Sequence, residues 1–202
     1  MKERGMIFNG EMVRAILDGR KTQTRRPVKF PVHDKNLGCE LAGNELAGEL
    51  SAGNYLNSSF GKPGDRIWVR EAFRVHSRAT DVATLVYKAS ERNSWTEQTH
   101  RVPVAVCNKP ATPEKWTPSI HMPRWASRIL LEITDVRVER LQEITLGDIC
   151  KEIGCGLYDF RPATHGFQVW EELWQSIYGA ENWNANPWVW VIEFKRVEGG
   201  AV

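Results

Sequence analysis

The alternation of apolar and polar side chains in two stretches constrains the fold of this chain more than any other sequence feature. In residues 67–75 every second side chain lies on a more apolar face, and residues 188–195 alternate with apolar side chains on both faces at the start. A period of two residues is typical of β-strands. Strand-like runs also cover residues 82–89, 101–107 and 129–140. The first two flank a polar turn around Asn93 and Ser94, which predicts a hairpin. The sequence therefore predicts an α+β chain, mainly β, built as a small β-barrel decorated by short helices.

Three segments carry helix signals. Residues 5–18 begin with a short apolar piece and continue as a helix, for which Asn9 is a favourable N-cap. Residues 146–153 follow Thr145, which opens a pattern similar to a capping box, and Gly154 is expected to end this helix. Residues 166–178 repeat large apolar side chains at helical spacing, and this stripe predicts a helix packed on the core.

The length of 202 residues and the hydrophobic content of 42% are sufficient for one domain over residues 1–202. Residues 32–63 are rich in Gly, Asn and Ser and predict a long surface loop. Residues 108–127 contain four prolines and predict an extended connection. We therefore expect a single domain with insertions at about 32–63 and 76–127.

The cysteines and the apolar runs bear on location and on metal binding. Four cysteines are scattered along the chain and no long apolar run is present, so we expect a cytoplasmic protein without membrane contact. Cys150 and Cys155 lack a second cysteine pair, and His121 and His165 lie at no recognised ligand spacing. The sequence predicts neither a metal site nor a cofactor.

A basic stretch follows the first predicted helix. The net charge is only +2, so any contact with nucleic acid requires a local patch. Residues 20–29 supply one, with no acidic residue and five cations: Arg20, Lys21, Arg25, Arg26 and Lys29. Donors at a helix exit can converge on an anion, or they can complement the helix dipole as a solvated terminus. A P-loop is excluded because no Gly directly precedes Lys21.

Lys21 and Thr24 lie three residues apart and suggest nucleophilic chemistry. A Thr hydroxyl attacks only after a base removes its proton, and a Lys that is desolvated or crowded by cations can be that base. A leaving amine also needs a proton donor, for which Glu71, Glu132 and Glu152 are candidates. Glu71 falls on the apolar face of its strand, so it is either a paired interior carboxylate or a site residue.

Several pieces of the chain together resemble one known family. They are, in order, Gly19-x-Lys21-x-x-x-x-Arg26 after a short helix, and the segments 62–71 (KPGDRIWVRE), 122–128 (MPRWASR), 144–154 (ITLGDICKEIG) and 186–194 (NPWVWVIEF). This pattern is similar to ASCH-domain proteins encoded by bacteriophages and prophages. The resemblance covers most of the chain and implies a PUA-like β-barrel linked to RNA.

The resemblance also implies site residues. Within the ASCH superfamily a small bacterial enzyme hydrolyses the amide of N4-acetylcytidine, and its residues map onto Lys21 as base, Thr24 as nucleophile and Glu152 as acid. Arg26 would steady the site or contact a phosphate. This chain is considerably longer than that enzyme, and its insertions at 32–63 and 76–127 could reshape the pocket.

The leading hypothesis is binding of a modified nucleoside or RNA base, with hydrolysis of an acetylated cytidine. An alternative is an accessory module that binds RNA or DNA without catalysis. There Arg25 and Arg26 would contact phosphates, and Trp68 or Trp125 would stack on a base. Glu71 is a further candidate for substrate binding. A third alternative is a phage protein whose barrel mediates protein contacts, and the sequence predicts no oligomeric state.

Overall fold

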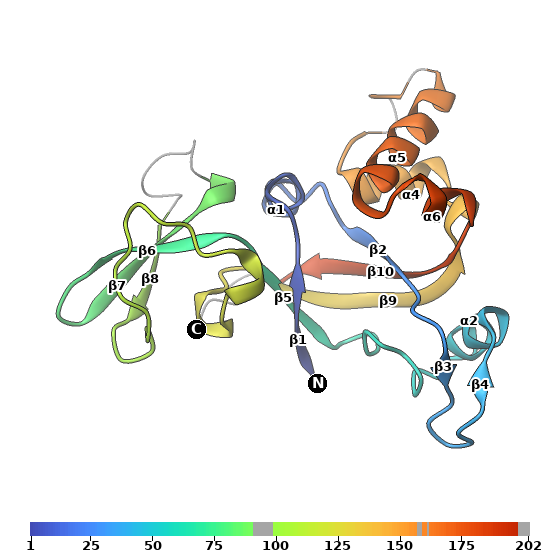
Figure 1. The fold of residues 1–202 in the computed structure, drawn as a ribbon, viewed down its shortest axis with the longest axis horizontal. Helices are drawn as coiled ribbons and strands as arrows, with labels where there is room; N and C mark the ends of the chain where they lie inside the picture. Colours follow the sequence, from blue (N-terminus) through green and yellow to red (C-terminus); the bar gives the residue numbers. More distant parts are fainter. Residues whose placement is uncertain (91–98, 157–158, 161, 198–202) are drawn as a thin grey trace.

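The computed structural model describes residues 1–90, 99–156, 159–160 and 162–197, and within them the chain is an α+β protein with three β-sheets (Figure 1). The main sheet has the strand order β1-β5-β9-β10-β2. Its strands are β1 (Glu3–Ile7), β5 (Arg66–Arg70), β9 (Leu130–Arg140), β10 (Trp188–Arg196) and β2 (Gln23–Pro27). Among these described strands, β1 and β5 pair in parallel and the other neighbours pair antiparallel.

The main sheet is open, which corrects the expectation of a closed barrel. β1 and β2 are its two edges, and no ladder joins them among the described residues. The other strands form a two-stranded sheet and a three-stranded sheet beside it. The segments 67–75 and 101–107, expected in one barrel, each contribute only part of their length, to β6 and β8, in the three-stranded sheet.

β10 is covered on both faces, as the sequence predicted. Trp190 and Ile192 belong to the core that includes α1 (Gly10–Leu17) and α2 (Gly43–Ser51). Val189 and Val191 point the other way. They pack in a second core with helices α4 (Leu146–Ile153) and α5 (Ala163–Tyr178). A short helix, α6 (Ala180–Asn184), follows α5 in the chain.

The helix ends agree with the sequence signals. The Asn9 side chain accepts a hydrogen bond from the N–H of Met12 (2.8 Å), and Thr145 caps α4 through the N–H of Asp148 (3.2 Å). Gly154 ends α4 in the left-handed region, with φ +83°. None of the described helices is long and apolar enough to cross a membrane.

The three-stranded sheet projects from one end of the main sheet (Figure 1). It contains β6 (Phe73–Arg78), β7 (Val82–Tyr87) and β8 (Thr99–Pro103), and the antiparallel pairing of β7 with β8 confirms the predicted hairpin. The expected turn around Asn93 and Ser94 lies outside the described residues. The predicted strand 67–75 is interrupted at Glu71 and Ala72, where the chain passes from β5 into β6.

The segment 32–63 is not the surface loop that the sequence predicted. It forms the strand pair β3 (Val32–His33) and β4 (Glu40–Leu41), and then α2. Leu46 and Leu50, one helical turn apart, are buried in the main core. Gly43 and Gly48 lie inside this helix, so the glycine content suggested a loop where tertiary packing stabilises a helix.

Short 3-10 turns complete the fold. They are η1 (Lys88–Ser90), η2 (Ser119–His121), η3 (Arg124–Ala126) and η4 (Leu141–Glu143). η2 and η3 lie in the connection that was expected to be wholly extended, each directly after a proline. Through Met122 and Ala126 this connection packs against the core of the three-stranded sheet.

Candidate functional site

The basic stretch leads from the end of α1 into edge strand β2. Gly19 adopts φ +72°, which lets the chain turn back after the helix. The N–H groups of Arg20 and Lys21 both donate to the main-chain oxygen of Ala15, at 2.8 and 3.0 Å. β2 begins two residues later and pairs, among the described strands, with β10 alone, so Lys21 and Thr24 lie at an edge of the main sheet.

Lys21 and Glu152 form a buried pair at this edge. Nζ of Lys21 lies 3.2 Å from Oε1 of Glu152, and the two side chains are 0% and 3% exposed. Nζ also donates to the main-chain oxygens of Gln23 (2.7 Å) and of Glu152. The three acceptors engage all three N–H bonds of an ammonium group. Burial lowers the pKa of Lys21, whereas the Glu152 carboxylate opposes this change.

The sequence predicted the direction of this pKa change and allowed two causes, desolvation and the nearby cations Arg20, Arg25 and Arg26. Desolvation is the largest cause, and Arg26 and Arg25 add smaller effects in the same direction. Lys21 can therefore lose its proton more readily than an exposed lysine.

The same pair covers the free edge of β2. Gln23 directs its carbonyl oxygen to Lys21, while the N–H of Arg25 donates to Oε1 of Glu152 (3.1 Å). An edge strand otherwise leaves such groups without a partner. Lys21 and Glu152 thus take the place of a neighbouring strand, and any chemistry at the carboxylate occurs beside the backbone of β2.

Thr24 has a buried hydroxyl without a partner. Its side chain is 0% exposed, and Oγ1 has no hydrogen bond within the part of the chain that the structure describes. Thr24 stands opposite Ile192 in the pairing of β2 with β10. Burying an unpaired hydroxyl costs about 1–3 kcal/mol, so this position calls for an explanation.

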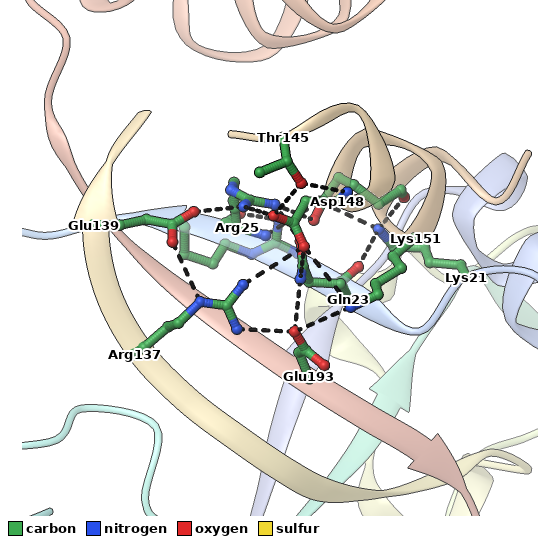
Figure 2. A network of polar contacts seen from close by, with 11 residues as sticks. Lys21, Gln23, Arg25, Arg137, Glu139, Thr145, Asp148, Lys151 and Glu193 are labelled. Atoms are coloured by element: carbon green, nitrogen blue, oxygen red, sulfur yellow. Dashed lines mark hydrogen bonds and ion pairs between the residues drawn. The ribbon is translucent and has the colours of Figure 1, made fainter. Parts of the chain in front are cut away.

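Arg25 points into a network of ion pairs (Figure 2). Its guanidinium lies 2.5 Å from Glu139, 3.7 Å from Asp148 and 6.0 Å from the ring centre of Trp170, and it also donates to Oε1 of Gln23. Only 1% of Arg25 is exposed. The proposed contact of Arg25 with a phosphate is therefore not open from the surface.

Arg137 on β9 completes this network, which Figure 2 shows converging from β2, β9, β10 and α4. Its guanidinium contacts Asp135 (2.9 Å), Glu139 (3.2 Å), Asp148 (3.6 Å) and Glu193 (2.8 Å). Burial alone would raise the pKa values of Asp148 and Glu193, but hydrogen bonds and nearby cations lower both overall. The network therefore holds ionised carboxylates around Arg25 and Arg137.

Arg26 contacts the end of β1 and the residue that follows it. Its guanidinium lies 5.5 Å from the ring centre of Phe8 and donates to the main-chain oxygen of Ile7 (2.9 Å). Arg26 and Glu152 line a narrow cavity with apolar side chains of α5. Glu152 also lines a second cavity of about 470 Å³, between α1 and α5.

The other predicted site residues lie elsewhere. Glu71 forms two hydrogen bonds with Arg128 (2.9 and 3.1 Å), and burial raises its pKa against the effect of this arginine. It lines a separate cavity of about 780 Å³ beside the start of α1. Trp68 lies under the guanidinium of Arg70 (5.4 Å) on β5, which β9 and β10 separate from β2.

Glu132 and Trp125, two further candidate residues, have partners outside the Lys21–Glu152 pair. Glu132 pairs with Lys195 (2.9 Å) on the sheet surface and does not join Lys21. Trp125 packs against Phe73, with ring centres 6.2 Å apart. Of the three acid candidates, Glu152 alone contacts Lys21 among the described residues. Among the described residues, no group of His, Cys, Asp and Glu side chains is suited to hold a metal ion, around Cys150 or elsewhere.

Sequence reasoning missed the polar network around the site. Gln23, Arg137, Glu139, Asp148 and Glu193 were not identified as site residues. The alternation of β2 contains a usable signal, since Gln23 and Arg25 share the face opposite to Thr24. The long-range partners of this face depend on the sheet order, which local patterns do not specify.

Comparisons with protein-family models, with curated proteins and with solved structures find no match to this chain.

Proposed function

We propose that this chain is an ASCH-type amidohydrolase that binds a modified nucleoside or RNA base and converts N4-acetylcytidine into cytidine and acetate. Support comes from one arrangement: the Lys21–Glu152 contact is buried beside the strand that carries an unpartnered Thr24 hydroxyl. The order of the sequence motifs supports the kinship with ASCH proteins and a distant relation of the open sheet to PUA-like barrels. An origin in a phage or prophage remains part of this proposal.

The proposed reaction begins with a proton shift inside the buried pair. Lys21 as a neutral amine and Glu152 as a carboxylic acid hold the same number of protons as the ion pair. Transfer over 3.2 Å converts one form into the other. The neutral form carries no buried charge, so an apolar acetyl group bound beside the pair favours it over the ion pair. This form supplies a base and an acid at the same time.

The first half of the reaction transfers the acetyl group. Lys21 removes the proton of Thr24 Oγ1 as this oxygen bonds to the acetyl carbon, and Arg26 stabilises the oxyanion. The C–N bond then breaks while Glu152 gives its proton to N4, which releases cytidine. Thr24 is left as an acetyl ester, Lys21 as an ammonium and Glu152 as a carboxylate.

The second half hydrolyses the ester. Glu152 takes a proton from a water molecule whose oxygen attacks the acetyl carbon. Lys21 returns its proton to Oγ1 as the ester bond breaks, and the acetyl group leaves as acetic acid, which gives its proton to the solvent and becomes acetate. The site then has its starting number of protons, so the cycle requires neither a metal ion nor a cofactor.

Incubation of the purified protein with N4-acetylcytidine, followed by chromatography for cytidine, tests the proposal. Thr24→Val keeps the shape of the side chain without its hydroxyl and should abolish turnover, whereas Thr24→Ser should retain part of it. Thr22→Val removes a hydroxyl two residues away and serves as the matched control. Absence of cytidine at high protein concentration, or full activity of Thr24→Val, would contradict the proposal.

One observation favours binding without turnover as a second candidate. In the ion-pair form all three N–H bonds of Lys21 are engaged, so this lysine is not a free base. If this form persists with ligand bound, the site holds a nucleoside without cleaving it. Binding of N4-acetylcytidine in equilibrium dialysis without formation of cytidine would identify this case.

A further inference from the structure

A cavity of about 550 Å³ lies away from the Lys21–Glu152 pair, between the start of β1 and the segment that joins α2 to β5. Its lining includes four cationic residues: Lys2, Arg4, Lys35 and Lys62. Asp65 is the one acidic residue among the lining residues. We call this the basic cavity. Its charge differs from that of the cavity beside Glu71, where acids and cations alternate in the lining.

The cations of the basic cavity are not neutralised by ion pairs. Among the described residues, none of the four forms a salt bridge. Arg4 donates to the main-chain oxygen of Ser59, and Lys35 donates to that of Leu56. A carbonyl oxygen satisfies a donor but leaves the full positive charge in place. Four like charges around one hollow repel one another, and an anion would relieve this repulsion.

Asp65 holds this arrangement together and offsets only part of its positive charge. Its two oxygens accept hydrogen bonds from the main-chain N–H of Lys2 (2.7 Å) and that of Lys62 (3.3 Å). The main-chain oxygen of Lys2 in turn accepts from the N–H of Arg66 (2.8 Å). Because Asp65 binds the backbone of two cationic residues, it brings their side chains to the same rim.

The lining of the basic cavity also contains an aromatic surface. Tyr55 is half-buried and contacts the main core, and it lines the cavity beside the exposed Leu56. A single phosphate ion would occupy only a small part of this volume. Cations along a groove together with an aromatic ring are the combination that binds the backbone and stacks the bases of single-stranded nucleic acids.

We propose that the basic cavity is a binding site for the phosphate backbone of a single-stranded nucleic acid, with Tyr55 stacking on a base. The site is independent of the hydrolase proposal, because it contains neither Lys21 nor Glu152. Lys35, Tyr55 and Lys62 all come from the segment 32–63, so the insertion builds most of this site.

Binding of a labelled oligouridylate of about ten nucleotides, measured by fluorescence anisotropy over a range of salt concentrations, tests this inference. The probe has no acetylated base, so its binding does not depend on turnover. The double variant Lys35→Ala/Lys62→Ala should bind several-fold more weakly. Its slope of log affinity against log salt should fall by about 1.4, or about 0.7 for each cation removed.

Lys115→Ala is the matched control, since Lys115 is exposed, forms no ion pair among the described residues and lies outside the basic cavity. It should leave affinity and slope nearly unchanged. Tyr55→Leu should weaken binding about five- to tenfold without changing the slope. Circular dichroism checks that each variant is folded.

Three results would overturn the inference. The first is equal affinity and slope for the native protein and the folded double variant, and the second is an equal loss in Lys115→Ala. The third is saturable binding of inorganic triphosphate that a large excess of oligouridylate does not displace, because the cavity would then bind a free polyphosphate and not a strand.

Discussion

Nζ of Lys21 lies 3.2 Å from Oε1 of Glu152, although the two residues are 131 positions apart in the chain. We expect Glu152→Gln to lower the free energy of unfolding by about 3–5 kcal/mol, because it leaves the buried lysine without its counter-charge. Lys21→Met should also destabilise the fold. The double variant should lose less than the sum of the two single changes, which urea denaturation in a double-mutant cycle measures. Strict additivity would contradict direct coupling of the two groups.

Thr24→Val should leave the free energy of unfolding unchanged or raise it by up to about 1 kcal/mol. The reason is that Oγ1 of Thr24 is buried without a hydrogen bond, so its removal breaks no contact in the described part of the chain. Denaturant midpoints of the native protein and the variant test this. A loss well above 1 kcal/mol would show that the hydroxyl has a partner in solution.

The carboxylates of the Arg137 network should make the fold sensitive to acid. The folded-state pKa values of Asp148 and Glu193 lie below the ordinary values of 3.8 and 4.5. Their contribution to the stability of the fold is therefore complete above about pH 5. It is lost as the pH falls through the lower, folded-state pKa values. Thermal midpoints between neutral pH and about pH 3 should fall, and Arg137→Gln should flatten this fall. An identical pH profile for the variant would contradict the assignment.

Leu46→Ala should destabilise the protein by about 2–5 kcal/mol, because Leu46 is 0% exposed within the main core. Leu37→Ala is the control, since Leu37 belongs to the same segment and is 80% exposed. Its effect should stay within about 0.5 kcal/mol. Equal effects of the two changes in chemical denaturation would mean that the segment 32–63 does not belong to the cooperative core.

The elements of this fold follow largely from local sequence signals. The caps at Asn9 and Thr145, the turn at Gly154 and the alternation in residues 188–195 each act within a few residues, and the structure agrees with all of them. Helix α2 was missed because its stability comes from contacts of Leu46 and Leu50 with distant strands. The open sheet was missed because strand order depends on long-range pairing.

The candidate site, like the fold, could be predicted from the sequence only where local signals specify it. The spacing of Lys21 and Thr24 was visible in the sequence, and the resemblance selected Glu152 over the other acids. The burial of Arg25 was not visible, because a run of cations resembles a solvated patch until its partners on β9 and α4 are known. Glu71 was expected to be either paired or functional, and Arg128 is the pairing partner that no local pattern indicated.

The cover that Lys21 and Glu152 provide for β2 has a consequence for aggregation. An uncovered edge strand can recruit a strand from another molecule, and native proteins block such edges with charged side chains. Here the blocking atoms are those assigned to the reaction, so substitutions made to silence the chemistry would also expose a template for strand addition. Loss of activity in Lys21 or Glu152 variants should therefore be interpreted together with light scattering, whereas Thr24→Val changes the hydroxyl and leaves this edge covered.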